Sequence, residues 1–223
     1  MKRGKFIVFE GIDGCGKTTQ AVRLKNHINS YLRQSNSKII CEGEEEPFAG
    51  DVIGGNIRAV LSRQIKIPGD ALAHLYVANR LTHISTILPK LESGNHIICD
   101  RYYYSNFAYN QTPNTSLDDL IIANKLCIEQ LRPDVVFYLH ISPEVAYERR
   151  KGSRLTEDAN DSMEKQIQVA TNYDIVMQRF KEEYSDNIFK IECDDLTEDM
   201  LADTIWDYLI ANIFPNRKFD QFF

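Results

Sequence analysis

The amino-acid sequence predicts an α/β fold: a five-stranded parallel sheet with helices on both faces. Short apolar runs alternate along the chain with longer segments of helical periodicity, which is the pattern of βαβ units. The first apolar run passes directly into a glycine-rich turn and then into a helix. The 223 residues, 43% hydrophobic and 26% charged, suffice for one large globular domain. We therefore expect a single domain over residues 1–223, with a short lid at about residues 149–162.

Five runs rich in β-branched and aromatic residues are expected to form buried strands. The first of them, residues 5–10 (KFIVFE), meets glycine at once, and the fourth, residues 134–141 (DVVFYLHI), is the longest. The five expected strands cover residues 5–10, 38–41, 96–99, 134–141 and 188–192. Because helical segments separate them, right-handed crossovers and a parallel sheet follow.

Helical periodicity is clearest in residues 17–32, where four apolar side chains recur on one face. The expected helices cover residues 17–32, 56–63, 71–91, 117–131, 143–150 and 198–213. Pro89 is expected to disturb the end of the third. Residues 151–162 (KGSRLTEDANDS) are polar and contain glycine, aspartate and asparagine, which favours a loop or lid.

Composition excludes several classes of function. The formal net charge of −6 argues against broad binding to nucleic acid or to an anionic membrane. The five cysteines are widely spaced and form neither a C-x-x-C pair nor a zinc pattern, which predicts reduced, buried thiols. The apolar run near the N-terminus is too short for a signal peptide, and no run is long enough for a membrane helix. We expect a cytoplasmic protein without nucleic-acid or membrane partners.

One motif carries most of the chemistry. After the first expected strand the chain reads G-I-D-G-C-G-K-T, residues 11–18, which matches the phosphate-binding pattern G-x-x-x-x-G-K-[ST]. Its glycines allow a tight turn that points several N–H groups inward, and the following helix adds its positive end. The expected ATP-binding residues are Gly11, Ile12, Asp13, Gly14, Cys15, Gly16, Lys17, Thr18 and Thr19.

The loop assigns roles to two side chains. Lys17 supplies a cation for the β- and γ-phosphates, and the Thr18 hydroxyl can coordinate Mg²⁺. The motif therefore predicts binding of a nucleoside triphosphate. It does not define the reaction, but a GTPase would carry N-K-x-D for guanine, whereas residues 124–127 read N-K-L-C. A motor ATPase would usually be larger, with a strand that ends in an acidic pair.

A second candidate site follows the third expected strand, where the chain reads Asp100, Arg101, Tyr102. Ligands bind at the carboxyl edge of open α/β sheets. Asp100 can orient a hydrated Mg²⁺ or assist an acceptor, and Arg101 is placed for a second phosphate. A surface ion pair is the simpler alternative for these two residues.

Two further groups are spaced to share one helix face. Tyr76 and Arg80 combine an aromatic plane with a guanidinium, a suitable grip on a base and its phosphate. Ser105, Asn106 and Tyr109 fall at i, i+1 and i+4, and the Asn106 amide can both donate to and accept from a pyrimidine edge. Either group alone is common on ordinary helices.

At these positions the chain resembles the thymidylate (dTMP) kinases, from Phe6 to about Tyr173. The matching pieces are FEGIDGCGKTTQ at residues 9–20, Glu46-Pro47, LYVANR at residues 75–80, DRY at residues 100–102, SNFAY at residues 105–109 and RPD at residues 132–134. Each piece except the loop is weak alone, whereas their order and spacing together are specific.

The resemblance implies a P-loop nucleoside monophosphate kinase fold and the reaction ATP + dTMP → ADP + dTDP with Mg²⁺. It implies a homodimer formed by helices that pack between subunits. The roles it implies are an acceptor-side and metal carboxylate for Asp13, stacking on thymine for Tyr76, base and phosphate contact for Arg80, phosphate binding for Arg101, the pyrimidine edge for Asn106, and exclusion of a 2′-hydroxyl for Tyr109.

Some relatives carry a catalytic arginine in the phosphate loop where this chain has Gly14. The compensating charge must then come from the lid region, where Arg149, Arg150 and Arg154 are candidates beside Lys151. Closure would bring one of them over the transferring phosphoryl group, whose developing charge needs stabilisation. The sequence does not decide between them.

The chain departs from the family pattern at two positions. Where the family commonly reads T-R-E-P-G-G, residues 44–49 read E-E-E-P-F-A, so that Glu45 occupies the arginine position. Tyr76 stands where the family has phenylalanine. These departures leave open a kinase of the same fold for dUMP or a 5-substituted dUMP. A separate alternative is a nucleotide-gated binding module without turnover, against which the intact Lys17, Thr18 and Asp100 argue. A panel of monophosphate acceptors distinguishes all three.

Overall fold

The computed structural model describes residues 2–151 and 162–214. Its centre is one sheet of five parallel strands in the order β2-β3-β1-β4-β5. The strands are β1 (Phe6–Glu10), β2 (Cys41–Glu45), β3 (His96–Asp100), β4 (Val135–His140) and β5 (Ile188–Glu192). The predicted fold class, with five parallel strands, is therefore confirmed.

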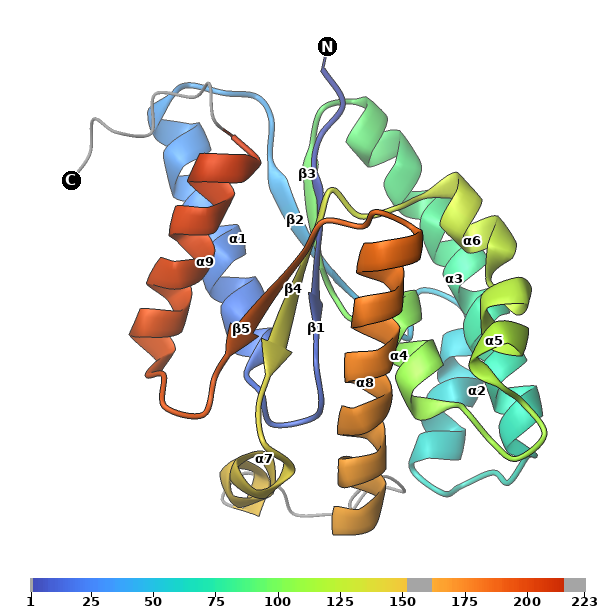
Figure 1. Ribbon diagram of the computed structural model, residues 1–223. Helices are drawn as coiled ribbons and strands as arrows, with labels where there is room; N and C mark the ends of the chain where they lie inside the picture. Colours follow the sequence, from blue (N-terminus) through green and yellow to red (C-terminus); the bar gives the residue numbers. More distant parts are fainter. Residues whose placement is uncertain (1, 152–161, 215–223) are drawn as a thin grey trace.

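Helices cover both faces of the sheet (Figure 1). One face carries α1 (Lys17–Gln34) and α9 (Glu198–Asn212). The other carries α3 (Gly69–Glu92), α4 (Tyr103–Tyr109), α5 (Leu117–Ala123), α6 (Lys125–Gln130) and α8 (Met163–Glu183). The helices α2 (Val52–Leu61) and α7 (Pro143–Lys151) lie toward the end where the strands finish. The three central strands are buried on both sides, as the apolar runs predict.

Several predicted boundaries were wrong for identifiable reasons. β2 begins at Cys41, where the expected strand ended. The prediction missed it because its sequence, CEGEE, is too charged to resemble a strand. It occupies an edge of the sheet, where charged side chains are tolerated, and Lys90 pairs with both Glu42 and Glu44. α2 starts earlier than expected because Asp51 caps it, accepting a hydrogen bond from the Gly54 amide.

Other helices differ in extent. The expected helix over residues 117–131 is divided at Asn124 into α5 and α6. α3 continues past Pro89 to Glu92, because a proline in the last turn removes only one intrahelical hydrogen bond. The helix α8 was not predicted from the sequence. No helix of the described chain is long and apolar enough to cross a membrane.

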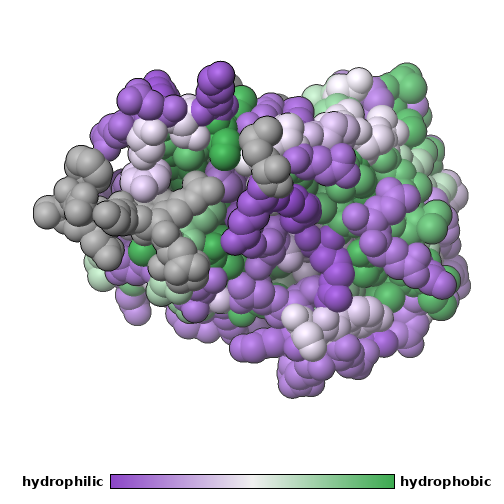
Figure 2. Space-filling view, turned by 90° about the horizontal axis from the view of Figure 1, so that it is seen from above, coloured by the Kyte–Doolittle hydropathy of each residue, from purple (hydrophilic) through white to green (hydrophobic). Residues whose placement is uncertain are grey.

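The surface is uneven in polarity. Figure 2 shows hydrophobic residues gathered on the side where α3, α5 and α6 lie, whereas polar residues prevail elsewhere on this face. Ile122 of α5 and Leu126 of α6 are 71% and 56% exposed. All five cysteines are buried and free, as predicted.

Candidate active site

The topology brings the two candidate sites of the sequence together. β1 and β3 are neighbours in the sheet, and Phe9 pairs with Asp100. The phosphate loop leaves the carboxyl end of β1, so it begins beside the last residue of β3. Parallel strands end at one edge, which explains why residues separated by almost ninety positions share one site.

The loop conformation depends on glycine at two close approaches. Gly11 and Gly14 have φ of 146° and 95°, which other residues rarely adopt. A Cβ on Gly11 would lie 2.5 Å from the Leu139 carbonyl oxygen, and one on Gly14 would lie 2.6 Å from that of Ala146. The loop is therefore pressed between the end of β4 and α7, with no room for side chains.

Lys17 and Thr18 open α1 at the mouth of a cavity of about 360 Å³. The Lys17 side chain is only 5% exposed, and Nζ donates to the Ile12 carbonyl oxygen at 3.0 Å. The cavity lining comprises Asp13, Gly14, Gly16, Lys17, Thr18, Thr19, Asp100, Arg101, Arg149 and Arg150. Positive charge and the helix N-terminus suit this cavity to the phosphates of a nucleotide.

Two of the three predicted metal residues are in direct contact. Thr18 Oγ1 donates to Asp100 Oδ2, whereas the buried Asp100 Oδ1 has no hydrogen-bond partner within the described chain. No group of three or more His, Cys, Asp or Glu residues that could hold a metal occurs among residues 2–151 and 162–214. An oxygen-lined site with few protein ligands suits Mg²⁺, which keeps several waters and binds substrate phosphates. Thr18, Asp100 and the nearby Asp13 therefore fit this ion.

A second cavity, of about 260 Å³, adjoins the first. Its lining includes all six predicted substrate-binding residues: Tyr76, Arg80, Arg101, Ser105, Asn106 and Tyr109. Asp13 and Arg101 line both cavities. The two cavities thus meet at one carboxylate and one guanidinium.

Arg101 is the most heavily bonded residue at this junction. Its backbone has φ of 71°, an unusual conformation for a residue with a side chain. Nη2 donates to Asp13 Oδ1 at 2.6 Å, while Nη1 donates to Ser105 Oγ at 2.9 Å and to the Tyr173 hydroxyl at 3.0 Å. The guanidinium carbon lies 5.1 Å from the centre of the Tyr109 ring. This network fixes both the position and the plane of the guanidinium.

Arg80 is held equally firmly, and it is only 1% exposed. Nε donates to Glu46 Oε2 at 2.7 Å, and Nη1 donates to Asn124 Oδ1 at 2.6 Å. Glu46 also faces His83, whose Nδ1 lies 3.3 Å from Oε1. The charge of Arg80, which lines the cavity, is therefore already balanced by the buried Glu46 carboxylate.

The remaining residues of the cavity are mainly aromatic and amide. Burial raises the pKa of Tyr76 to about 12, so its hydroxyl stays neutral. Asn106 Nδ2 donates to the Ala73 carbonyl oxygen at 3.3 Å, and its Oδ1 accepts from Asn110. The Tyr109 hydroxyl donates to Asp13 Oδ2 at 3.4 Å. A flat polar ring fits between such groups.

Glu45, the residue that departs from the family pattern, does not line this cavity. It is exposed and faces a neighbouring hollow of about 350 Å³, together with Lys25 of α1 and Phe48. An acidic residue there does not confront an anion held at Arg101. Its position removes one of the two reasons to expect an unusual acceptor, and Tyr76, the other, keeps the aromatic ring in the cavity.

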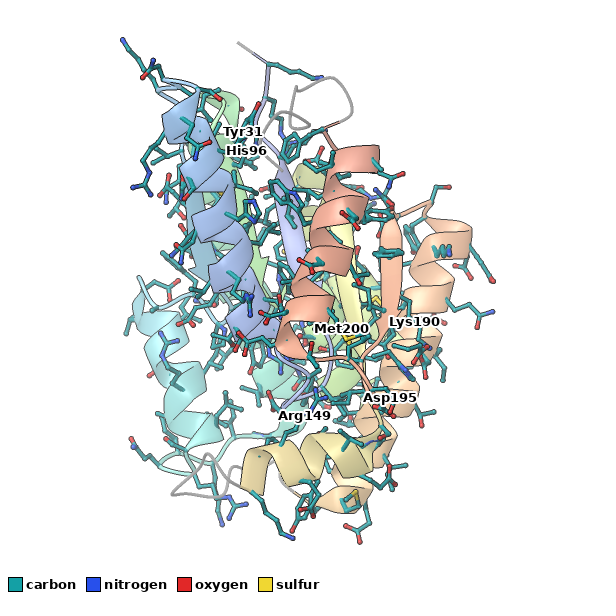
Figure 3. The ribbon with its side chains drawn as sticks, turned by 90° about the vertical axis from the view of Figure 1, so that its left-hand side faces the viewer. Tyr31, His96, Arg149, Lys190, Asp195 and Met200 are labelled. Carbon is teal, nitrogen blue, oxygen red and sulfur yellow. The ribbon has the colours of Figure 1, made fainter. Side chains whose placement is uncertain are left out.

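The arginines of α7 are placed differently from one another. Arg149 Nη2 donates to the Cys193 carbonyl oxygen at 3.1 Å, and Figure 3 shows Arg149 near Asp195 at the end where the strands finish. Arg150 is 8% exposed, and its Cγ would lie 3.2 Å from a Cβ at Gly14. Arg154 and most of the expected lid lie outside the described residues.

Three residues of the site were missed from the sequence. Tyr173 accepts a hydrogen bond from Arg101, Glu10 accepts from Ser105 and Tyr173, and Glu46 neutralises Arg80. A signal existed for Glu10, since a charged residue directly after four apolar ones seldom lies in a core without a partner. Tyr173 could not be predicted as a site residue because α8, the helix that carries it, had not been expected.

Comparisons with known proteins give concordant results for the chain as a whole. The family model described as Thymidylate kinase matches residues 9–203. The thymidylate kinase of Caldicellulosiruptor saccharolyticus is 35% identical over 152 residues, covering 67% of this chain and 70% of that protein. That of Caldanaerobacter subterraneus subsp. tengcongensis is 32% identical over 185 residues, covering 82% and 86%. The solved structure of thymidylate kinase from Candida albicans has the same fold, with a TM-score of 0.77 and 21% identity over 95% of this chain and 93% of that one.

Proposed function

This chain belongs to the thymidylate kinase family, and we propose that it transfers the γ-phosphoryl group of ATP to dTMP, giving ADP and dTDP. One observation carries the proposal beyond family membership: the phosphate-loop cavity and the aromatic cavity meet at Asp13 and Arg101. A kinase must bring two anions together at one point. The shared residues give that point a fixed cation next to a carboxylate.

The donor side begins with the loop. Backbone N–H groups of residues 11–18 and the Lys17 ammonium hold the β- and γ-phosphates of ATP. Thr18 and Asp100, with Asp13 nearby, would hold Mg²⁺, which would neutralise part of the charge on the phosphates. Lys17 moves from the Ile12 carbonyl to the phosphates as ATP binds, at the expense of one hydrogen bond.

The acceptor side orients dTMP. Arg101 binds its phosphate. The residues bonded to the guanidinium fix its orientation, and this sets the direction in which the acceptor phosphate attacks. The Tyr76 ring stacks on the base, Asn106 meets the pyrimidine edge, and Tyr109 occupies the space beside the sugar 2′ carbon. Transfer is then direct and in line, since positioning and charge stabilisation supply most of the catalysis.

Residues of α7 complete the charge compensation. Arg150 is packed against the loop at Gly14, and Arg149 lines the same cavity. Gly14 leaves the loop without an arginine of its own, so one of these side chains, or Arg154, approaches the transferring group. Exclusion of water at that moment protects ATP from hydrolysis.

The first test is a coupled assay of ADP release with ATP and Mg²⁺, offering dTMP, dUMP, UMP, CMP, AMP and GMP in parallel. We expect dTMP to be the best acceptor and UMP to be at least about tenfold poorer in kcat/KM. Tyr109→Ala should raise the relative rate with UMP if this ring excludes the 2′-hydroxyl. Absence of turnover with every acceptor would contradict the proposal.

We also propose a homodimer that buries the apolar side formed by α5 and α6. Ile122 and Leu126 are exposed there, and Figure 2 shows hydrophobic residues along this side. Sedimentation of the wild type and of Leu126→Glu tests the assembly, and a monomeric wild type would refute it.

We further propose that the enzyme works in the cytoplasm, which suits five free cysteines.

A further inference from the structure

A carboxylate that plays no part in the reaction described above lies completely buried behind Arg101. Glu10, the last residue of β1, is 0% exposed. Its Oε1 accepts from the Tyr102 amide at 2.7 Å and the Ser105 amide at 3.3 Å. Its Oε2 accepts from Ser105 Oγ at 2.7 Å and from the Tyr173 hydroxyl at 2.9 Å. A buried charge with this many donors is a built arrangement.

The same two hydroxyls connect Glu10 to Arg101. Arg101 Nη1 donates to Ser105 Oγ and to the Tyr173 hydroxyl, 2.9 and 3.0 Å away. The two hydroxyl oxygens lie 2.7 Å apart. Each hydroxyl has a single proton, and a guanidinium can only donate. Because the carboxylate attracts at least one of the two protons, oxygen lone pairs remain directed toward Arg101.

The element that supplies Tyr173 is bonded to the acceptor side at further points. Asn172 Nδ2 donates to the Ala108 carbonyl oxygen at 2.8 Å, and Lys165 Nζ donates to that of Tyr109 at 3.4 Å. α8 is thus fixed against α4, which places the Tyr173 hydroxyl at a defined distance from the guanidinium. A hydroxyl on a fixed helix is a more precise support than one on a loop.

We propose that Glu10 and Tyr173 are positioning residues for the acceptor phosphate, acting through Arg101 and with Ser105 as their second bridge. This inference rests on the proposed function, because it needs Arg101 to bind the phosphate of the acceptor. The two hydroxyls hold Nη1 of the guanidinium, and the Asp13 carboxylate holds Nη2. Loss of one bridge leaves Arg101 charged and present but less fixed in direction.

A purely structural role is the competing explanation, since burial of Glu10 requires donors whatever Arg101 does. Burial raises the pKa of Glu10, against the charge of Arg101 and the hydrogen bonds from Ser105, Tyr102 and Tyr173, so these donors matter to stability. The two roles differ in what they change. A structural role lowers the melting temperature only, whereas a positioning role changes the kinetics of the acceptor and leaves those of ATP alone.

The test compares two substitutions of the same kind on touching rings. Tyr173→Phe removes the hydroxyl that bonds Arg101. Tyr138→Phe removes one that bonds Asp174 instead, at 3.2 Å, and its ring stacks on Tyr173 at 5.7 Å between centres. For Tyr173→Phe we expect kcat/KM for dTMP to fall by about tenfold or more, as for a hydrogen bond to a charged group, with KM for ATP within about twofold of wild type. Tyr138→Phe should leave both constants near wild type.

Two more variants keep the outcome decisive. Ser105→Ala should resemble Tyr173→Phe, and Ser105→Thr, which keeps a hydroxyl, should recover most of the loss. Glu10→Gln combined with Tyr173→Phe should cost less than the product of the single losses, since both act through Arg101. Wild-type kinetics for dTMP in a folded Tyr173→Phe enzyme would overturn the inference. Wild-type protein without turnover of dTMP would instead overturn the proposed function.

Discussion

The donor and acceptor sides of this site are adjacent, yet they are constructed in opposite ways. The proposed donor side is one contiguous stretch, residues 11–19, whose backbone amides and Lys17 are expected to provide most of the binding. The acceptor side gathers side chains from the ends of β1 to β3 and from α3, α4 and α8. Its two arginines are already paired, Arg80 with Glu46 and Arg101 with Asp13.

The two sides should therefore respond differently to substitution. In the described structure Lys17 bonds only to a backbone carbonyl and weakly to the Cys15 thiol, so little of the fold depends on its charge. The acceptor-side arginines instead pair with carboxylates, one of which, Glu46, is buried, while the other, Asp13, is partly exposed. Their partners are therefore expected to contribute to stability as well as to function.

The largest expected effect is on the acceptor side, in Glu46→Ala. The substitution leaves Arg80 buried without its carboxylate and also removes a partner of His83. Breaking a buried pair by removing one member typically costs about 3–5 kcal/mol of unfolding free energy. Urea unfolding followed by circular dichroism measures this loss. Glu129→Ala, in the exposed pair with Lys125, is the control and should cost less than about 1 kcal/mol.

On the donor side, Lys17→Ala should reverse this balance. Turnover with saturating substrates is expected to fall by at least about a hundredfold, comparable to the loss of one key charge stabiliser. The melting temperature should stay close to wild type, because no buried carboxylate loses its partner. Lys25→Ala, on the same helix but outside the loop, should retain turnover. If Lys17→Ala unfolded as readily as Glu46→Ala, the contrast between the two sides would be wrong.

The same contrast explains what the sequence could and could not predict. The loop, α1 and the ends of β1 and β3 were predictable because the motif is contiguous in the sequence and its glycines indicate a tight phosphate-binding turn. The six residues predicted to bind the substrate, through a resemblance spread over several short pieces, also line one cavity. What could not be predicted was pairing: nothing local indicates that Glu46 faces Arg80 or that Tyr173 reaches Arg101.

A smaller effect is expected from the charges on β2 that support this pairing. His83 Nε2 lies 3.5 Å from Glu44 Oε2, and Lys90 Nζ donates to Glu44 Oε1 at 2.8 Å. The contact with His83, followed by that with Lys90, lowers the pKa of Glu44 to about 2 despite partial burial. Because the pKa is lower in the folded state, the stabilisation is complete above the ordinary value of 4.5 and is lost as the pH falls through about 2.

Glu44→Gln tests this dependence. The wild type should exceed the variant by about 2–3 kcal/mol in unfolding free energy at pH 6 and by about half as much at pH 3. Glu42→Gln is the matched control on the same strand, since Glu42 bonds Lys90 without facing His83. A difference between wild type and Glu44→Gln that stays constant with pH would show that shape, not charge, explains the contribution of Glu44.

The smallest expected effect sharpens the description of the donor side. Thr18→Ala removes the hydroxyl that donates to Asp100 Oδ2. The other oxygen of that carboxylate, Oδ1, already lacks a hydrogen-bond partner within the described chain. We expect the Mg²⁺ concentration for half-maximal turnover to rise by about tenfold, the size of one lost oxygen ligand or charged hydrogen bond. Thr18→Ser, which keeps the hydroxyl, should stay near wild type. An unchanged Mg²⁺ requirement in Thr18→Ala would place the metal-holding role on Asp13 and Asp100 alone, and the donor side would then depend on assembled side chains as the acceptor side does.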